Sequence, residues 1–96
     1  MMVLVCYDIS FTEGNGEKRL RKVAEICTDF GQRVQYSMFE CIVDPAQWEK
    51  LKHKLLQEID KEHDSLRFYY LGSNWRRKIE DHGFKKSFDQ ESPLII

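Results

Sequence analysis

Apolar side chains open the chain as an uninterrupted run rather than an alternating one. Residues 1–7 are Met, Met, Val, Leu, Val, Cys and Tyr, and the run ends at Asp8. A run rich in β-branched and aromatic residues is typical of a strand that is buried on both faces. The segment Val3 to Ser10 therefore predicts the central strand of the fold, with a carboxylate at its C-terminal end.

Helical spacing first appears after the loop from Phe11 to Lys18, which contains two glycines and an asparagine. The spacing predicts a helix over roughly 16–30, with Asn15 as the N-cap and Gly31 as the C-terminal stop. Its apolar face consists of Leu20, Val23, Ala24, Cys27 and Phe30.

A second helix begins with a strong capping signal. Asp44 is the expected N-cap, Pro45 the first helical residue, and Gln47 the residue that completes a capping box. The pattern continues to about Asp60. Its buried stripe consists of Trp48, Leu51, Leu55 and Ile59, with Leu56 beside them. This stripe is typical of a core and does not indicate a cofactor site.

The remaining apolar segments predict strands. The alternation in 31–43 changes near Ser37, which indicates either two strands or one strand with a bulge. Residues 65–71 predict another strand, and residues 75–83 a short one. Leu94, Ile95 and Ile96 follow a polar stretch, so they are expected to dock as an edge strand on this subunit or on a partner.

This order of elements predicts an α+β fold, a ferredoxin-like βαββαβ sandwich with an extra C-terminal strand. The domain would span 1–83, and a tail would span 84–96. Two helices cover only one face of such a sheet, whereas its strands are apolar on both faces. A homodimer with sheet packed on sheet would bury the second face.

Composition narrows the class of protein. The chain has 96 residues, 42% of them hydrophobic and 32% charged, which fits one soluble globular domain. The apolar start is too short to span a membrane and does not resemble a signal peptide, so the cytoplasm is the expected location. Three scattered cysteines predict core thiols in a reducing compartment, with no zinc site.

Asp8 is the first candidate for chemistry. A carboxylate at the end of a buried strand either accepts hydrogen bonds from the following loop or binds a divalent cation such as Mg²⁺ or Mn²⁺. One carboxylate makes a poor metal site. The predicted dimer would bring two copies of Asp8 toward its axis and supply the second ligand.

Two basic clusters are candidates for phosphate contacts, although each also fits a solvated surface. The first cluster comprises Lys18, Arg19, Arg21 and Lys22, and the second comprises Arg76, Arg77 and Lys78. The net charge of −1 argues against a protein that coats nucleic acid by bulk charge.

Five segments together resemble a known family. They are VLVCYDIS, KRLRKVAEIC, GQRVQYSMFEC, DSLRFYYL and RKIEDHG, in this order along nearly the whole chain. They resemble the small universal adaptation protein of CRISPR systems, the "Cas two" family. The resemblance implies a ferredoxin-like homodimer that joins a larger integrase subunit in inserting new spacers. For many members it also implies metal-dependent cleavage of RNA or DNA.

The resemblance assigns the metal-binding aspartate to Asp8, with one Mg²⁺ or Mn²⁺ ion shared between two copies. Its neighbouring functional positions fall on Tyr7, Ser10, Arg19, Arg33 and Phe39. Asp8, Ser10, Arg19 and Arg33 form the candidate catalytic set. The candidate nucleic-acid-binding set is Arg19, Arg21, Lys22, Arg76, Arg77 and Lys78.

Three functions stay open at this point. The first is an adaptor that bridges the integrase and holds duplex DNA, with nuclease activity as an addition. The second is a toxin-like endoribonuclease acting on single-stranded RNA. The third is a ferredoxin-like regulatory module without catalysis, for which the sequence carries no recognisable pocket signature.

Overall fold

A computed structural model describes residues 1–12, 14–71 and 79–84. The elements are β1 (Met2–Asp8), α1 (Gly16–Thr28), β2 (Gly31–Gln35), β3 (Met38–Ile42), α2 (Pro45–Glu58), β4 (Ser65–Leu71) and β5 (Ile79–Gly83). The change of alternation near Ser37 thus marks a turn between two strands. The order confirms the predicted βαββαβ arrangement with one further strand, β5.

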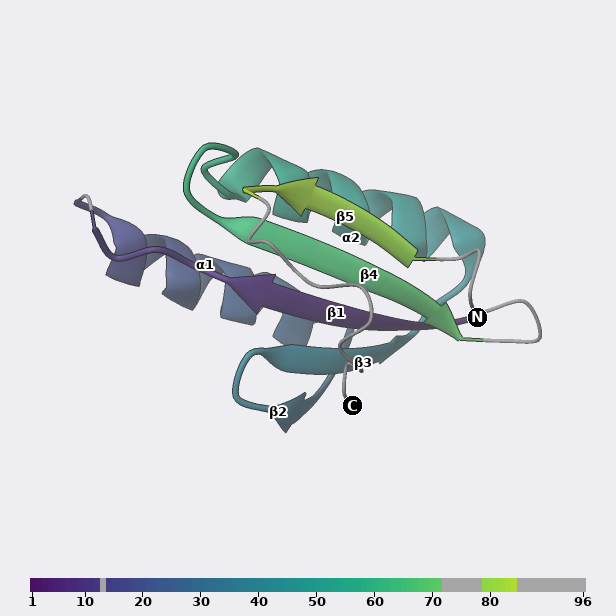
Figure 1. Cartoon of the computed structure of the whole chain (residues 1–96). Coiled ribbons are helices and arrows are strands. Elements are labelled where there is room, and N and C mark those ends of the chain that lie inside the picture. Colours follow the sequence, from purple (N-terminus) through teal and green to yellow (C-terminus); the bar gives the residue numbers. More distant parts are fainter. Residues whose placement is uncertain (13, 72–78, 85–96) are drawn as a thin grey trace.

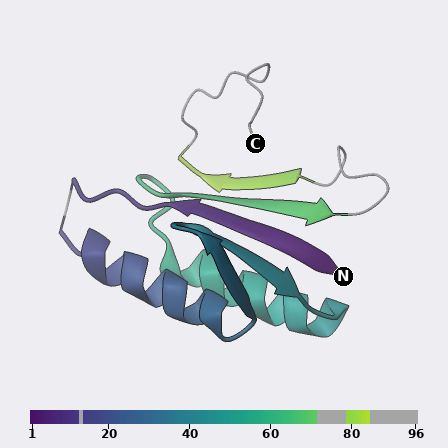
Figure 2. The same cartoon turned by 90° about the horizontal axis from the view of Figure 1, so that it is seen from below.

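The five strands form one antiparallel sheet in the order β2-β3-β1-β4-β5, so β1 occupies its centre. Both helices pack on the same face of this sheet (Figures 1 and 2). The ferredoxin-like prediction is confirmed, because the chain has the βαββαβ order and both helices lie on one face of the antiparallel sheet. The other face has no helical layer.

The core lies between the sheet and the helices. Alternate residues of β1, from Val3 through Val5 to Tyr7, are buried there. Trp48 of α2 packs edge-on against Phe68 of β4, with ring centroids 4.8 Å apart. Both predicted helical stripes face this core, which contains Val23, Cys27, Trp48, Leu51, Leu55 and Ile59. The helical spacing therefore identified the core-facing side of each helix.

The start of α2 agrees with the sequence prediction, whereas the two ends of α1 differ from it. Asp44 and Gln47 form the predicted capping box of α2. Asn15 precedes α1 as expected, but its backbone is left-handed and its side chain makes no capping hydrogen bond. The helix ends at Thr28, and Gly31 already belongs to β2. A Cβ on Gly31 would lie 2.4 Å from the Glu40 carbonyl oxygen, so close strand packing requires this glycine.

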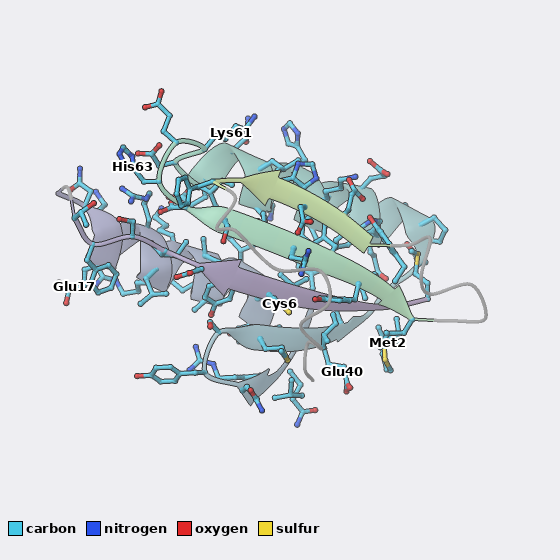
Figure 3. The ribbon with its side chains drawn as sticks, in the orientation of Figure 1. Met2, Cys6, Glu17, Glu40, Lys61 and His63 are labelled. Atoms are coloured by element: carbon cyan, nitrogen blue, oxygen red, sulfur yellow. The ribbon has the colours of Figure 1, made fainter. Side chains whose placement is uncertain are left out.

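The second face of the sheet carries no helix and is called here the helix-free face. It presents Leu4, Cys6, Asp8, Met38, Ile42, Arg67, Tyr69 and Leu71, by the strand register and alternation. In Figure 3, Met2, Cys6 and Glu40 project from it. Ile42 is 72% exposed and Leu71 is 44% exposed in the single chain. Its apolar residues lie beside the charged side chains of Asp8, Glu40 and Arg67, and the dimer contact on this face stays a prediction.

Two predicted features lie outside the described residues: the basic cluster Arg76 to Lys78 and the apolar tail end Leu94 to Ile96. Within the described ranges, no helix is long and apolar enough to cross a membrane. The three cysteines are free thiols. Cys27 and Cys41 lie in the core as predicted, whereas Cys6 is partly exposed on the helix-free face, so the core prediction was wrong for Cys6. Burial raises the pKa of Cys27 to about 12. Such a thiol is protonated at neutral pH, as expected for a core residue.

Candidate metal and nucleic-acid site

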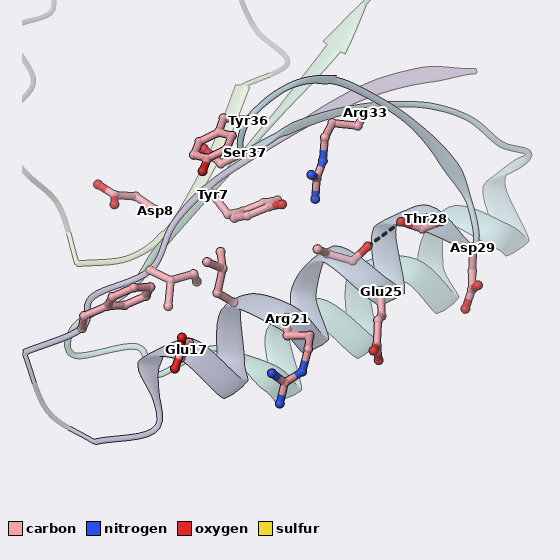
Figure 4. A pocket seen from close by; sticks show the side chains of 14 residues that line it. Tyr7, Asp8, Glu17, Arg21, Glu25, Thr28, Asp29, Arg33, Tyr36 and Ser37 are labelled. Atoms are coloured by element: carbon pink, nitrogen blue, oxygen red, sulfur yellow. Dashed lines mark hydrogen bonds between the residues drawn. The ribbon is translucent and has the colours of Figure 1, made fainter.

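Asp8 ends β1 and is exposed on the helix-free face. Figure 4 shows that Asp8 and Tyr7 project to opposite sides of β1, as strand alternation requires. Asp8 pairs with Ser65 of β4, and Ser65 pairs with Gly83 of β5. The three residues therefore form one row across the sheet, called here the Asp8 rim.

Ser10 lies in the loop that leaves this rim. Its hydroxyl contacts the Thr12 hydroxyl at 2.9 Å and accepts a hydrogen bond from the Thr12 N–H at 3.2 Å. Its own N–H donates to Oδ1 of Asp64 at 3.0 Å. The loop therefore has a local turn and a fixed attachment to the segment that precedes β4.

Asp64 is fully buried and accepts hydrogen bonds from three residues. Arg19 donates through Nε to Oδ2 at 2.8 Å and through Nη2 to Oδ1 at 3.1 Å. The Asp60 N–H donates to Oδ2 at 2.8 Å, in addition to the bond from Ser10. Burial by itself would raise the pKa of Asp64, but the hydrogen bonds from Arg19, Asp60 and Ser10 outweigh it and hold that pKa below its usual value.

Arg33 lies away from this junction, on the edge strand β2. It is paired with Phe39 in the register, and its guanidinium lies 5.2 Å from the centre of the Phe39 ring. Tyr7 stacks on Phe39 from β1, with ring centroids 6.3 Å apart. The Tyr7 hydroxyl is buried without a hydrogen-bond partner among the described residues, and burial raises its pKa although Arg33 opposes this.

A groove of about 880 Å³ runs between α1 and the β2–β3 turn. Its wall includes Tyr7, Glu17, Arg21, Glu25 and Arg33 (Figure 4). Asp8 lies at its margin with the side chain directed away from Tyr7. The groove is therefore flanked by carboxylates as well as arginines, and it does not form a uniformly basic channel.

The predicted catalytic residues thus divide into two groups. Ser10 and Arg19 meet at Asp64, beside the Asp8 rim. Arg33 belongs to the helix-covered side, with Tyr7 and Phe39. Asp64 was not predicted, because an aspartate before a strand has no sequence feature that reveals burial or partners 45 and 54 residues away.

The basic residues Arg21 and Lys22 are exposed on α1 and available to a phosphate backbone. Arg19 differs from them, since its side chain is only 13% exposed and is paired with Asp64. The second predicted cluster, Arg76 to Lys78, lies outside the described part of the chain.

Among the described residues of a single chain, Asp8 does not belong to a group of three or more possible metal ligands. The three side chains whose ligand atoms gather within 4.8 Å are Asp60, Glu62 and His63, in the turn before β4. Asp8 offers an exposed carboxylate of the type that Mg²⁺ and Mn²⁺ prefer. It fits such an ion as one of several ligands.

Comparisons with known proteins agree with this architecture. A family model described as "CRISPR associated protein Cas2" matches residues 1–79. A CRISPR-associated endoribonuclease Cas2 of Nitratidesulfovibrio vulgaris is 62% identical over 96 residues, covering 100% of this chain and 94% of the relative. A CRISPR-associated endonuclease Cas2 of Halalkalibacterium halodurans is 54% identical over the full length of both proteins. The crystal structure of Streptococcus pyogenes Cas2 at pH 6.5 matches with a TM-score of 0.70 and 56% identity, covering 83% of this chain and 96% of that one.

Proposed function

Because this chain belongs to the CRISPR-associated Cas2 family, we propose that it is a metal-dependent phosphodiester endonuclease and the small subunit of the spacer-acquisition machinery. It works in the cytoplasm as a homodimer that joins an integrase subunit and holds duplex DNA. The names of its relatives, which include both endoribonuclease and endonuclease, support the nuclease part.

The observation that carries the proposal is the position of Asp8. This carboxylate is exposed at the end of the central strand, on the helix-free face. Its neighbours in the same row are Ser65 and Gly83, both with small side chains or none. The small size of these neighbours supports an ion site at the Asp8 carboxylate.

A second copy completes the site. Leu4 and Cys6 of β1, with Ile42 of β3 and Leu71 of β4, give the helix-free face an apolar part. Packing two such faces on each other would remove this apolar surface from water and stabilise the dimer. Asp8 lies on the same face as these residues, so a twofold axis that passes near Asp8 would bring two carboxylates together.

The two Asp8 side chains would hold one Mg²⁺ or Mn²⁺ ion. When bound, that ion supplies Lewis-acid activation of the scissile phosphate and of water. Ser10 would bind a phosphate oxygen through its hydroxyl, exchanging the contact with Thr12. Arg19 fixes the loop that carries Ser10, and Arg33 adds positive charge to the wall of the groove.

Duplex DNA would contact α1 through its exposed cations, Arg21 and Lys22. Phosphate contacts of this kind position a duplex without reading its sequence. Arg76, Arg77 and Lys78 stay candidates for further phosphate contacts from the sequence, and single-stranded RNA is the second candidate substrate.

The test is cleavage of labelled RNA and duplex DNA with and without Mg²⁺, by the parent and by Asp8→Asn. We expect Mg²⁺-dependent cleavage by the parent and loss of cleavage in Asp8→Asn at unchanged circular dichroism. Cleavage that persists in Asp8→Asn would remove Asp8 from the site. Absence of cleavage by the parent on both substrates, with duplex binding intact, would leave the adaptor function alone.

A further inference from the structure

The structure assigns to Asp64 a role that no resemblance suggested: we propose that Asp64 is the positioning residue of the Asp8 rim. It touches neither metal nor substrate, and it holds the loop after Asp8 and the strand end beside Asp8 in one arrangement. The inference rests on the proposed function, because that function makes the geometry of Asp8 matter.

The first step is the attachment of the loop. Asp8 is followed two residues later by Ser10, whose N–H binds Oδ1 of Asp64 at 3.0 Å. Arg19 reinforces this point by binding both Asp64 oxygens and also the Ser10 carbonyl oxygen, at 3.2 Å. The backbone that follows Asp8 is therefore held at Ser10 through both its N–H and its C=O group.

The second step concerns the strands next to Asp8. The residue after Asp64 is Ser65, which is the register partner of Asp8. The Asp64 carbonyl accepts a hydrogen bond from the Phe84 N–H at 2.7 Å. Gly83 passes so close that a Cβ there would lie 2.2 Å from the same carbonyl oxygen. Asp64 thus contacts the chain on both sides of the Asp8 rim.

The third step is the chemistry of the side chain. Two carboxylate oxygens accept four hydrogen bonds, two of them from a guanidinium in bidentate geometry. The substitution Asp64→Asn would keep the shape of the side chain but leave one acceptor oxygen, with an NH₂ donor in place of the second. At either position the NH₂ group cannot accept from Arg19 or from the backbone N–H bound there, which is that of Ser10 at Oδ1 and that of Asp60 at Oδ2. The substitution therefore loosens the junction while changing little volume.

The expected consequence is a weaker metal site without loss of a ligand. Replacing a residue that orients a metal ligand without binding the metal itself commonly weakens metal affinity by about 10–100-fold. Because Asp64 acts through the loop and not through Asp8 directly, we expect the lower end, on the order of tenfold for Asp64→Asn.

The experiment measures Mn²⁺ affinity by electron paramagnetic resonance on the full chain, with Asp8→Asn defining binding elsewhere, such as at Asp60, Glu62 and His63. Amide hydrogen exchange at Ser10 is measured on the same samples. Asp44→Asn is the matched control, since Asp44 also binds a backbone N–H but lies at the start of α2. If Asp64→Asn does not fold, Arg19→Lys replaces it, because it keeps the charge and removes the bidentate contact.

We expect faster exchange at Ser10 and about tenfold weaker Asp8-dependent Mn²⁺ binding in Asp64→Asn or Arg19→Lys, and neither change in Asp44→Asn. A folded junction variant that binds Mn²⁺ as tightly as the parent would overturn the inference and leave the proposed function standing. Equal weakening in Asp44→Asn would also overturn it. A parent without Asp8-dependent binding would refute both the metal-dependent function and this inference.

Discussion

Glu80 connects the last described strand to α2 and β4, and its replacement should destabilise the fold in a pH-dependent way. Glu80 lies on β5, opposite Phe68 in the register of β4. Its carboxylate is 2.6 Å from Lys52 Nζ of α2 and 3.0 Å from His82 Nε2, and it also accepts from the Tyr70 hydroxyl. Since β5 pairs with β4 alone within the described sheet, we expect Glu80→Gln to weaken the attachment of β5.

The size of the effect follows from the pKa of Glu80. Partial burial would raise it, but the hydrogen bonds from Lys52, Tyr70 and His82 lower it from 4.5 to about 2. That interval corresponds to about 3.4 kcal/mol at about 1.36 kcal/mol per pH unit. The side chain is 33% exposed, so solvent screening reduces the expected contribution to about 1–2 kcal/mol.

The sign of the pH dependence is fixed by the same shift. A carboxyl whose pKa is lowered by folding stabilises the native state fully above its unfolded pKa, near 4.5. This contribution is lost as the pH falls toward 2. The free-energy difference between the parent and Glu80→Gln should therefore be largest at pH 7 and shrink steadily below about pH 4.5.

Urea unfolding at pH 7, 4 and 2.5 measures this difference, at one fixed protein concentration because association contributes to apparent stability. Glu25→Gln is the control, an exposed α1 carboxylate for which we expect a change within about 0.5 kcal/mol. Equal destabilisation by Glu80→Gln at pH 7 and pH 2.5, or none at pH 7, would refute the account of this network.

Two further predictions test the core and the nucleic-acid surface. Leu51 is fully buried, so Leu51→Ala should cost about 2–5 kcal/mol in urea unfolding, while Gln57→Ala on the exposed side of α2 should change stability by less than about 0.5 kcal/mol. The double substitution Arg21→Glu with Lys22→Glu should weaken duplex DNA binding in fluorescence anisotropy. The slope of log affinity against log salt concentration should fall by the equivalent of about two phosphate contacts. An unchanged slope, or an equal loss of binding in Lys61→Glu, would exclude α1 as the contact surface.

Much of the fold was predictable because the relevant signals are local. The continuous apolar run before Asp8 identified the central strand, and the Asp44 capping box fixed the start of α2. Gly31 shows the limit of such signals. The sequence suggested a helix stop, whereas the structure places this glycine in β2, where Glu40 and Cys41 leave no room for a Cβ. Only the strand pairing reveals that requirement.

The site was predictable only in part. Asp8 was identified because a carboxylate interrupts an apolar run at its end. Asp64 was missed, although it organises the same rim, since its partners Ser10 and Arg19 are brought to it by the tertiary fold. Arg19 shows the same limit. The sequence placed it in a surface basic cluster, whereas in the structure it is nearly buried and paired with Asp64.

The most direct test of the account is the number of Mn²⁺ ions bound per chain. Two Asp8 carboxylates on facing helix-free faces should hold one ion between them. Titration of the parent with Mn²⁺, followed by electron paramagnetic resonance at known chain concentration, should give one Asp8-dependent ion per two chains. The same titration of Asp8→Asn should lack that ion. One Asp8-dependent ion per single chain, or binding that Asp8→Asn leaves unchanged, would contradict the shared site.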